Sequence, residues 1–365
     1  MNGGLRRITE AEVEAIAIGA GVLGTGGGGS TYLGAIEARV YLREYGGVCP
    51  VISVDELVDE AIVCTVSVMG APTVGVEKMA RGDEVSLACR AWEEHTGKQM
   101  VAIGIAEIGG GNALSPIPAA LQLGLPLIDG DSMGRAFPEL QMDTLMIGGV
   151  PPVPFVLGDC HGNVAIFNEL DTPKRAEEYA RNLTIEMGGS AALVMPVTDG
   201  ATLKRHLIRD TLTLSWRLGN IILECRANGE DPAEHVAAAA NGFILYRGKI
   251  VDVFRRTVKG FARGRMRIAS LDHGQEELVI DFQNENLIAV QGDQILCTVP
   301  DLISLLTLEE GEPVGTEAIR YGLRVAVLAM PAPKELKTTT ALASVGPAAF
   351  GYPDVAFQAL PGDLL

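Results

Sequence analysis

The first half of the chain alternates two patterns of apolar residues, one typical of helices and one typical of buried strands. A helix is expected over 10–23, because a capping box of Thr9 and Glu12 precedes apolar positions at helical spacing. Between the helical stretches lie short runs that are almost entirely apolar. This alternation predicts a mostly parallel sheet flanked by helices. The predicted strands are VCPVISV (48–54), AIVCTVSVM (61–69), MVAIGIAEI (100–108) and LPLID (125–129).

The pattern changes near residue 168. Helices are expected near 173–187 and 210–226, and from residue 241 short apolar runs alternate with turn residues. Successive short strands and turns predict an antiparallel sheet or barrel. We therefore predict an α/β domain with glycine-rich loops over 1–168 and a β-rich, barrel-like domain over 169–365. The tail, 330–365, is a segment that can pack back on the first domain.

A run of glycines separates the first two predicted helices. The stretch GTGGGGSTYLG covers 24–34, and a helix interior would not hold it, since each glycine there costs roughly 1 kcal/mol relative to alanine. A nucleotide-binding loop would follow a strand, and the Walker lysine is absent, so nucleotide binding is the weaker interpretation. Bare backbone N–H groups before a helix can contact another ligand. We expect Gly26, Gly27, Gly28, Gly29 and Ser30 to bind the substrate; the alternative is a tight turn between closely packed elements.

Glycines and carboxylates also follow three of the predicted strands. Ligands bind at the carboxyl ends of parallel strands, so these loops are expected to meet the glycine run at one edge of the sheet. The glycines would bring backbone donors to a ligand, and the carboxylates would supply acid-base chemistry or hold a divalent metal. The candidates are Glu107, Asp129 and Asp131 as catalytic groups, Asp129 and Asp131 as metal ligands, and Gly70, Gly110, Gly111, Asn112 and Arg135 as substrate-binding groups.

These side chains also have structural interpretations. Asp129 and Asp131 would cap the following helix, and Arg135 would pair with Glu139 one helical turn later. Glu107 is harder to explain in this way, because a carboxylate at the end of an apolar strand is costly unless it is paired or functional.

The stretch Asp159-Cys160-His161-Gly162-Asn163 lies between two apolar runs. It places a thiol beside an imidazole, but Asp, Gly and Asn are the residues that a hairpin turn needs, and we favour the turn. A cysteine nucleophile, at Cys160 or Cys64, is the alternative catalytic mechanism.

Charge and composition narrow the choice of partners. The 365-residue chain has a formal net charge of −17, with 47% hydrophobic and 21% charged residues. Nucleic acid and anionic membranes are therefore unexpected partners, and neither a secretory signal nor a membrane-spanning run is evident. The six cysteines include no CxxC pair, so we expect reduced, mostly buried thiols in a cytoplasmic protein. A divalent metal and assembly into a homo-oligomer stay open.

Five ordered motifs resemble one family. They are GTGGGGSTYLG, MGAPTVGVEK, EIGGGNALSPIPAA, DGDSMGRAFPELQM and SVGPAAFGYP, and they extend over nearly the whole chain. The chain is similar to the S-methyl-thiohydantoin desulfurase-like family, whose members are often described as hydantoinase-related. The resemblance implies an α/β N-terminal domain, a β-rich C-terminal domain and a role in hydantoin-related catabolism.

Together with the loops, the resemblance predicts a hydrolase that acts on a small heterocyclic substrate. Water, activated by Glu107 or Asp131, would attack C2 of a thiohydantoin-type ring, and sulfide or a thiol would leave. Backbone N–H groups at 26–29 and 109–111 would stabilise the developing anion, and Asp129 or Asp131 would protonate the sulfur. The alternative is a non-catalytic module that binds a small molecule or serves as an accessory subunit of a hydantoinase system.

Overall fold

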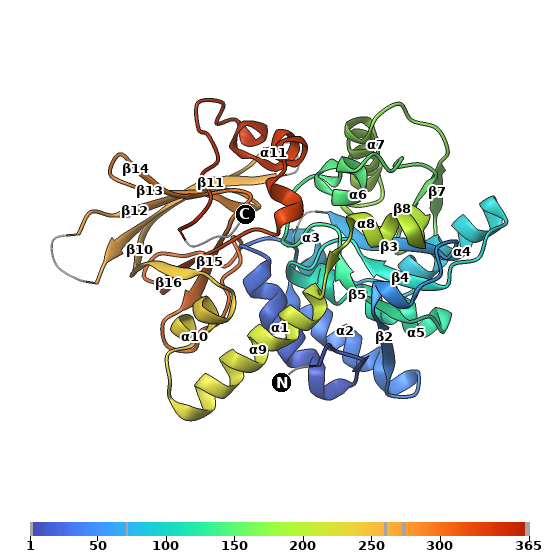
Figure 1. Cartoon of the computed structure of the whole chain (residues 1–365), viewed down its shortest axis with the longest axis horizontal. Helices are drawn as coiled ribbons and strands as arrows, with labels where there is room; N and C mark the ends of the chain where they lie inside the picture. Colours follow the sequence, from blue (N-terminus) through green and yellow to red (C-terminus); the bar gives the residue numbers. More distant parts are fainter. Residues whose placement is uncertain (1–2, 71, 259–260, 272–274, 362–365) are drawn as a thin grey trace.

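The computed structural model describes residues 3–70, 72–258, 261–271 and 275–361. Its strands form two sheets (Figure 1). Within the described residues the first sheet has nine strands in the order β1-β2-β5-β4-β3-β8-β6-β7, with β9 paired to β5. These strands are β1 (Arg7–Ile8), β2 (Cys49–Ile52), β3 (Ile62–Gly70), β4 (Ala102–Ile105), β5 (Leu127–Asp131), β6 (Phe155–Gly158), β7 (Val164–Phe167), β8 (Ser190–Asp199) and β9 (Ile208–Arg209).

Parallel pairing is confined to the centre of this sheet. Strands β2, β5, β4 and β3 are mutually parallel, and they correspond to the four strands predicted from the sequence. Strand β8 pairs antiparallel with β3, and the β6–β7 hairpin extends the sheet beyond it. The predicted α/β class is therefore confirmed, as a mixed sheet flanked by helices. Strands β8 and β9 follow residue 168 in the chain, yet both belong to the first sheet.

Helices follow most strands of the first domain, as the alternating pattern predicted. The capping box that was expected to begin the first helix is present: Thr9 accepts a hydrogen bond from the N–H of Ala11, and Glu12 accepts one from the N–H of Thr9. The helices are α1 (Glu10–Leu23), α2 (Thr31–Glu44), α3 (Pro72–Glu77), α4 (Glu84–Thr96), α5 (Pro116–Leu123), α6 (Thr144–Ile147), α7 (Pro173–Glu186), α8 (Gly200–His206) and α9 (Thr211–Asn228).

Helices α1 and α9 pack with their backbones in direct contact. A Cβ atom added at Gly19 of α1 would lie 1.8 Å from the carbonyl oxygen of Ser215, and one added at Gly219 of α9 would lie 1.8 Å from that of Ala15. No side chain fits at either position, so glycine is required on both helices. This contact fixes α1, and with it the glycine run that follows α1.

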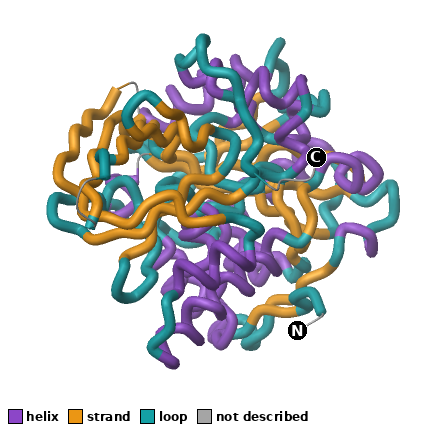
Figure 2. The backbone as a smooth tube through the Cα atoms, turned by 60° about the vertical axis from the view of Figure 1, so that its left-hand side comes forward, coloured by secondary structure: helices purple, strands orange, loops and turns teal. Residues whose placement is uncertain are grey.

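The second sheet is antiparallel and curled, in the order β14-β13-β12-β11-β10-β16-β15 (Figure 2). Its strands share a separate hydrophobic core that includes Met266, Ile280 and Val327. The predicted β-rich second domain is confirmed as a half-barrel. Its strands are β10 (Phe243–Val258), β11 (Phe261–Ser270), β12 (Leu278–Gln283), β13 (Glu285–Gln291), β14 (Gln294–Thr298), β15 (Leu302–Thr307) and β16 (Arg324–Met330).

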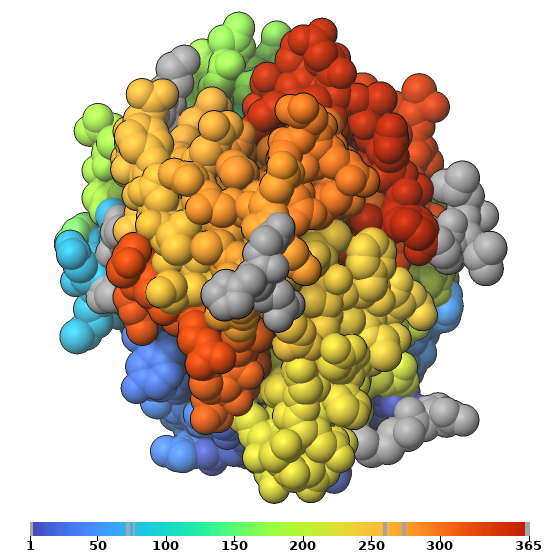
Figure 3. Space-filling view, turned by 90° about the vertical axis from the view of Figure 1, so that its left-hand side faces the viewer, coloured from blue at the N-terminus to red at the C-terminus, as the bar shows by residue number. Residues whose placement is uncertain are grey.

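The last α-helix of the described residues returns to the first domain. Helix α11 (Thr339–Val345) lies against α6 of the first domain. Seen from the side of the second sheet, residues of α9 and of α10 (Pro232–Ala239), in yellow, lie below its orange strands (Figure 3). In the described part of the chain, no helix combines the length and the apolar character that crossing a membrane requires.

Candidate active site

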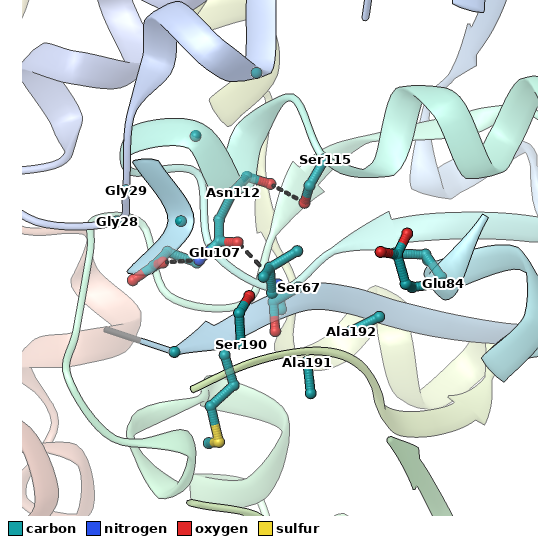
Figure 4. Close-up of a pocket in the computed structure, with 18 of the residues that line it drawn as sticks. Gly28, Gly29, Ser67, Glu84, Glu107, Asn112, Ser115, Ser190, Ala191 and Ala192 are labelled. Carbon is teal, nitrogen blue, oxygen red and sulfur yellow. Dashed lines mark hydrogen bonds between the residues drawn. The ribbon is translucent and has the colours of Figure 1, made fainter. Parts of the chain in front are cut away.

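A pocket of about 280 Å³ lies at the carboxyl ends of β3 and β4 (Figure 4). Its walls include the end of β3, the loops that follow β4 and β5, and residues 28–30 of the glycine run. The loops that were expected to meet at one sheet edge therefore do so. Residues 284–285, at the turn between β12 and β13, reach the pocket from the second sheet. Both domains thus contribute to one site.

Glu107 is a buried wall residue of this pocket. It follows β4 and is 6% exposed. Its Oε1 accepts a hydrogen bond from the backbone N–H of Phe137 (2.8 Å), and its Oε2 accepts one from Nδ2 of Asn112 (2.6 Å). Burial raises the pKa of Glu107 to about 7, although both hydrogen bonds lower it. The carboxyl group therefore changes ionisation near neutral pH, as a proton acceptor in catalysis should.

Asn112 determines how the Glu107 carboxylate is held. Its Oδ1 accepts a hydrogen bond from the backbone N–H of Val68 on β3 (2.9 Å), so the amide must turn its Nδ2 toward Glu107. The hydroxyl of Ser115 donates to the Asn112 carbonyl at 3.3 Å. Figure 4 shows Asn112 between Glu107 and Ser115. The end of β3 and the loop after β4 are thereby joined through one side chain that also orients the carboxylate.

Glu285 is a second buried carboxyl group in the pocket, and no local sequence pattern marks it. It is the first residue of β13 and is 2% exposed. Its Oε2 has no hydrogen-bond partner among the described residues. Burial raises its pKa well above the usual value, and the negative charge of Glu107 raises it further. The charge of Glu107 therefore acts on Glu285 across the domain boundary.

The glycines of 24–29 and 109–111 serve mainly to pack two loops against each other. A Cβ at Gly28 would lie 2.1 Å from the carbonyl oxygen of Gly109, and a Cβ at Gly110 would lie 2.4 Å from the carbonyl carbon of Gly28. The N–H groups of Gly111 and Asn112 donate to the carbonyls of Gly29 (3.1 Å) and Gly28 (3.2 Å). Of the N–H groups expected to form an anion cradle, those of Gly27 and Gly111 therefore already donate to backbone carbonyls, of Gly24 (2.8 Å) and Gly29.

Several predicted substrate-binding residues nevertheless line the pocket. They are Gly28, Gly29, Ser30, Gly70, Gly111 and Asn112. Gly26, Gly27 and Gly110 do not line it; the carbonyl of Gly26 instead accepts hydrogen bonds from the N–H (2.7 Å) and hydroxyl (3.1 Å) of Thr316 in the second domain.

Replacing Gly28 with alanine should destabilise the fold by about 2–5 kcal/mol. Its φ of +80° costs a residue with a Cβ roughly 1–2 kcal/mol, and the contact with Gly109 adds the cost of overpacking, about 1–3 kcal/mol. Gly29→Ala is the matched control, because its φ is +87° but no atom lies within 4 Å of its added Cβ. Urea denaturation of both variants measures the difference, and equal destabilisation would show that loop packing is not the reason for the glycine.

Asp129 and Asp131 do not line the pocket. Asp129 accepts hydrogen bonds from the N–H (3.0 Å) and the hydroxyl of Thr213, so it caps α9 rather than the helix that follows β5. Asp131 is fully buried, and its Oδ2 accepts hydrogen bonds from the N–H groups of Ile108, Met133 and Gly134 at 2.8–3.1 Å. Both aspartates hold backbone in place, outside the pocket.

Arg135 is also buried away from the pocket, so it cannot anchor a substrate carboxylate from this position. All five of its N–H donors are used. Nε donates to the carbonyl of Ala136, Nη1 to those of Pro300 and Asp301, and Nη2 to the Thr25 hydroxyl and the Asn286 carbonyl. Burial lowers the pKa of Arg135 to about 10, which leaves it charged at neutral pH. The residue joins the two domains, and the expected surface pair with Glu139 is wrong.

Asp143 and Cys160 also line the pocket. Asp143 caps α6, accepts a hydrogen bond from the Ser132 hydroxyl, and has its pKa raised by burial to about 7. Cys160 lines the pocket from the turn between β6 and β7. That turn is confirmed: Asp159 accepts hydrogen bonds from the N–H groups of His161 (2.9 Å) and Asn163 (2.8 Å). The other five cysteines are buried, as expected.

A group that can hold a metal lies elsewhere in the described part of the chain. Ligand atoms of Cys225, Glu230 and His235, near the end of α9 and on α10, lie within 4.8 Å of one another. None of these three residues lines the pocket. Asp129 and Asp131 do not form such a group within the described ranges.

Comparisons with known proteins extend over nearly the whole chain. The family model described as "S-Me-THD-like, N-terminal domain" matches residues 11–169, and that described as "S-Me-THD-like, C-terminal domain" matches residues 171–360. A crystal structure of a protein from Chromobacterium violaceum has a TM-score of 0.79 and 24% sequence identity, covering 98% of this chain and 100% of that one. At this identity the likeness shows a shared fold. The comparison with curated proteins finds no match.

Proposed function

The chain belongs to the S-Me-THD-like family over both of its domains, and we propose that it hydrolyses the bond between C2 and sulfur in a thiohydantoin-type ring. One observation carries the proposal. Glu107 is a buried carboxyl group in the wall of the pocket, and its pKa is about 7. It lies in one of the motifs on which the family resemblance rests. Such a group can accept a proton from water at neutral pH, which this reaction requires.

The proposed reaction forms one bond to carbon and breaks another. For an S-alkylated ring, the oxygen of water bonds to C2 and the C2–S bond breaks. One proton of the water ends on the ring nitrogen and the other on sulfur, giving a hydantoin and a free thiol. Glu107 accepts a proton from the attacking water, while Asn112 and the N–H of Phe137 keep the carboxylate oriented.

The size and lining of the pocket suit a small, planar ring. Its volume of about 280 Å³ is near the lower end of small-molecule sites, which span roughly 300–1,000 Å³. Ser67, Ser115 and Ser190 line it, and hydroxyl groups can donate to or accept from the N–H and C=O groups of such a ring (Figure 4). A binding module or accessory subunit would not need a buried, perturbed carboxyl group, and Glu107 therefore favours the hydrolase.

The test is thiol or sulfide release from a panel of thiohydantoins, including S-methylated and carboxylate-bearing rings. We expect the purified wild-type protein to release a thiol from at least one S-methylated ring and to form the matching hydantoin. Absence of release from every ring, by a folded protein supplied with divalent metals, would favour the binding-module alternative.

Two control arms separate the mechanisms within this experiment. Cys160→Ser should retain wild-type activity, because water is the proposed nucleophile; loss of activity in a folded variant would identify the thiol as the nucleophile. A chelator arm tests for a metal in the reaction. Loss of release with the chelator, restored by one added cation, would place a metal in the site.

A further inference from the structure

Glu285 is a buried carboxyl group of the pocket, and one of its two oxygens has no hydrogen-bond partner among the described residues. It is 2% exposed, and its Oε2 makes no hydrogen bond to any described residue. An unpaired polar atom in the interior costs about 1–3 kcal/mol. A carboxyl group with one such unpaired oxygen, in the wall of a pocket, is a candidate for a functional role.

The nearest cations do not give Glu285 a structural role. Arg135 forms no ion pair with Glu285, because all five N–H donors of its guanidinium already bind carbonyl and hydroxyl oxygens. Arg181 also lines the pocket, but its Nη2 donates to the carbonyl of Pro138 (2.9 Å) and its Nε to Glu177. The charges of both arginines act on Glu285 from a distance and leave its Oε2 free for a bound molecule.

Gly27 makes the room that Glu285 occupies. A Cβ at Gly27 would lie 2.0 Å from Oε1 of Glu285 and 2.6 Å from its carboxyl carbon. The backbone of Gly27 does not have a positive φ, so the contact with Glu285, rather than backbone strain, accounts for glycine at this position. The glycine run therefore positions a carboxyl group that comes from the other domain.

We propose that Glu285 is the acid partner of Glu107, a carboxylic acid that gives its proton to the bound ring. This inference rests on the proposed hydrolysis. As water adds to C2, Glu107 takes one of its protons and Glu285 protonates the ring nitrogen. As the C2–S bond breaks, Glu285 takes back the proton of the C2 hydroxyl group and Glu107 gives its proton to sulfur. Both carboxyl groups then have their starting protonation, and all atoms balance.

The first test compares hydrolysis by the wild type, Glu285→Gln and Gly27→Ala. Glu285→Gln keeps a hydrogen-bond donor but has no proton to transfer, so kcat should fall at least about 100-fold while KM changes less than about threefold. The wild type should lose activity at alkaline pH as Glu285 ionises, and the residual activity of Glu285→Gln should lack that limb. Gly27→Ala should lower kcat about tenfold by displacing the carboxyl group. Gly3→Ala, where nothing lies within 4 Å of the added Cβ and which lies outside the pocket, is its control.

The second test does not need turnover. The infrared difference spectrum between the wild type and Glu285→Gln at neutral pH should contain the C=O stretching band of a protonated carboxylic acid, and this band should shift when hydantoin binds. A spectrum without the band, or full kcat in Glu285→Gln on a ring that the wild type hydrolyses, would overturn the inference. If the wild type hydrolyses no ring, the proposed function fails, and the ligand-sensitive band alone decides whether Glu285 is the acid of this pocket.

Discussion

Replacing Glu107 with glutamine should lower kcat for ring hydrolysis by about 10²- to 10⁴-fold at pH 7, the range expected for loss of a general base. The substitution keeps the size of the side chain but removes its ability to accept a proton. It also places an amide NH₂ group where Nδ2 of Asn112 points, so two donors face each other. Asn112 cannot turn its amide over, because its Oδ1 is bound by the N–H of Val68. Thiol release under saturating substrate measures the effect.

The pH dependence of the wild type gives an independent check on Glu107. Its pKa of about 7 means that the ionised, active form is lost as pH falls through 7. In the free protein, kcat/KM should therefore decrease about tenfold for each pH unit below that value and level off above it, until the acid partner ionises. The residual activity of Glu107→Gln should lack this acidic limb.

Asp131→Asn is the matched control for Glu107→Gln. Asp131 is an equally buried carboxyl group on the neighbouring strand, but it binds backbone N–H groups outside the pocket. Its replacement should lower stability and leave kcat of the folded protein within about threefold of the wild type. If Asp131→Asn loses catalysis while Glu107→Gln retains it, the assignment of the base is reversed.

The contrast between Glu107 and the two aspartates shows how far sequence patterns reach into the site. All three carboxylates lie at the ends of apolar strands, and that signal placed them together correctly at one edge of the sheet. It could not separate them, because Asp129 binds Thr213 of α9, which is far away in the sequence. Which carboxylate stays open to the pocket depends on what packs over each strand end.

Local signals determined most of the elements that were predicted correctly. The capping box at Thr9 and the turn residues of 159–163 act within one turn of backbone, so they are visible in the sequence. Strand β8 was not predicted, because its place in the sheet depends on pairing with β3 and β6. Strand β3 lies more than 100 residues earlier in the chain, so no local pattern reports that pairing. The same limit applies to Glu285. It follows Asn284, whose φ is +58°, in a tight turn, and it reaches the pocket only because the two domains pack together.

Arg135 is the clearest case in which a polar motif residue serves the fold rather than the ligand, and its replacement should have the largest effect on stability. Arg135→Met removes a fully buried cation and leaves four carbonyl oxygens and the Thr25 hydroxyl without their donor. It also removes the stacking of the guanidinium over Phe137, at 4.9 Å from the ring centroid. We expect a loss of about 3–5 kcal/mol in the free energy of unfolding, as when a buried charged network is broken.

Urea denaturation of three variants tests this role for Arg135. Arg135→Lys keeps the charge but offers three donors to five acceptors, so its stability should fall between those of Arg135→Met and the wild type. Arg6→Met removes an exposed pair with Glu56 and should cost under about 1 kcal/mol. A substrate-anchoring role would give the opposite result: stability near that of the wild type, with a KM raised only for carboxylate-bearing rings. Because every donor of Arg135 is bound to the protein itself, we expect any rise in KM to affect neutral and acidic rings alike, through loss of the folded, two-domain pocket.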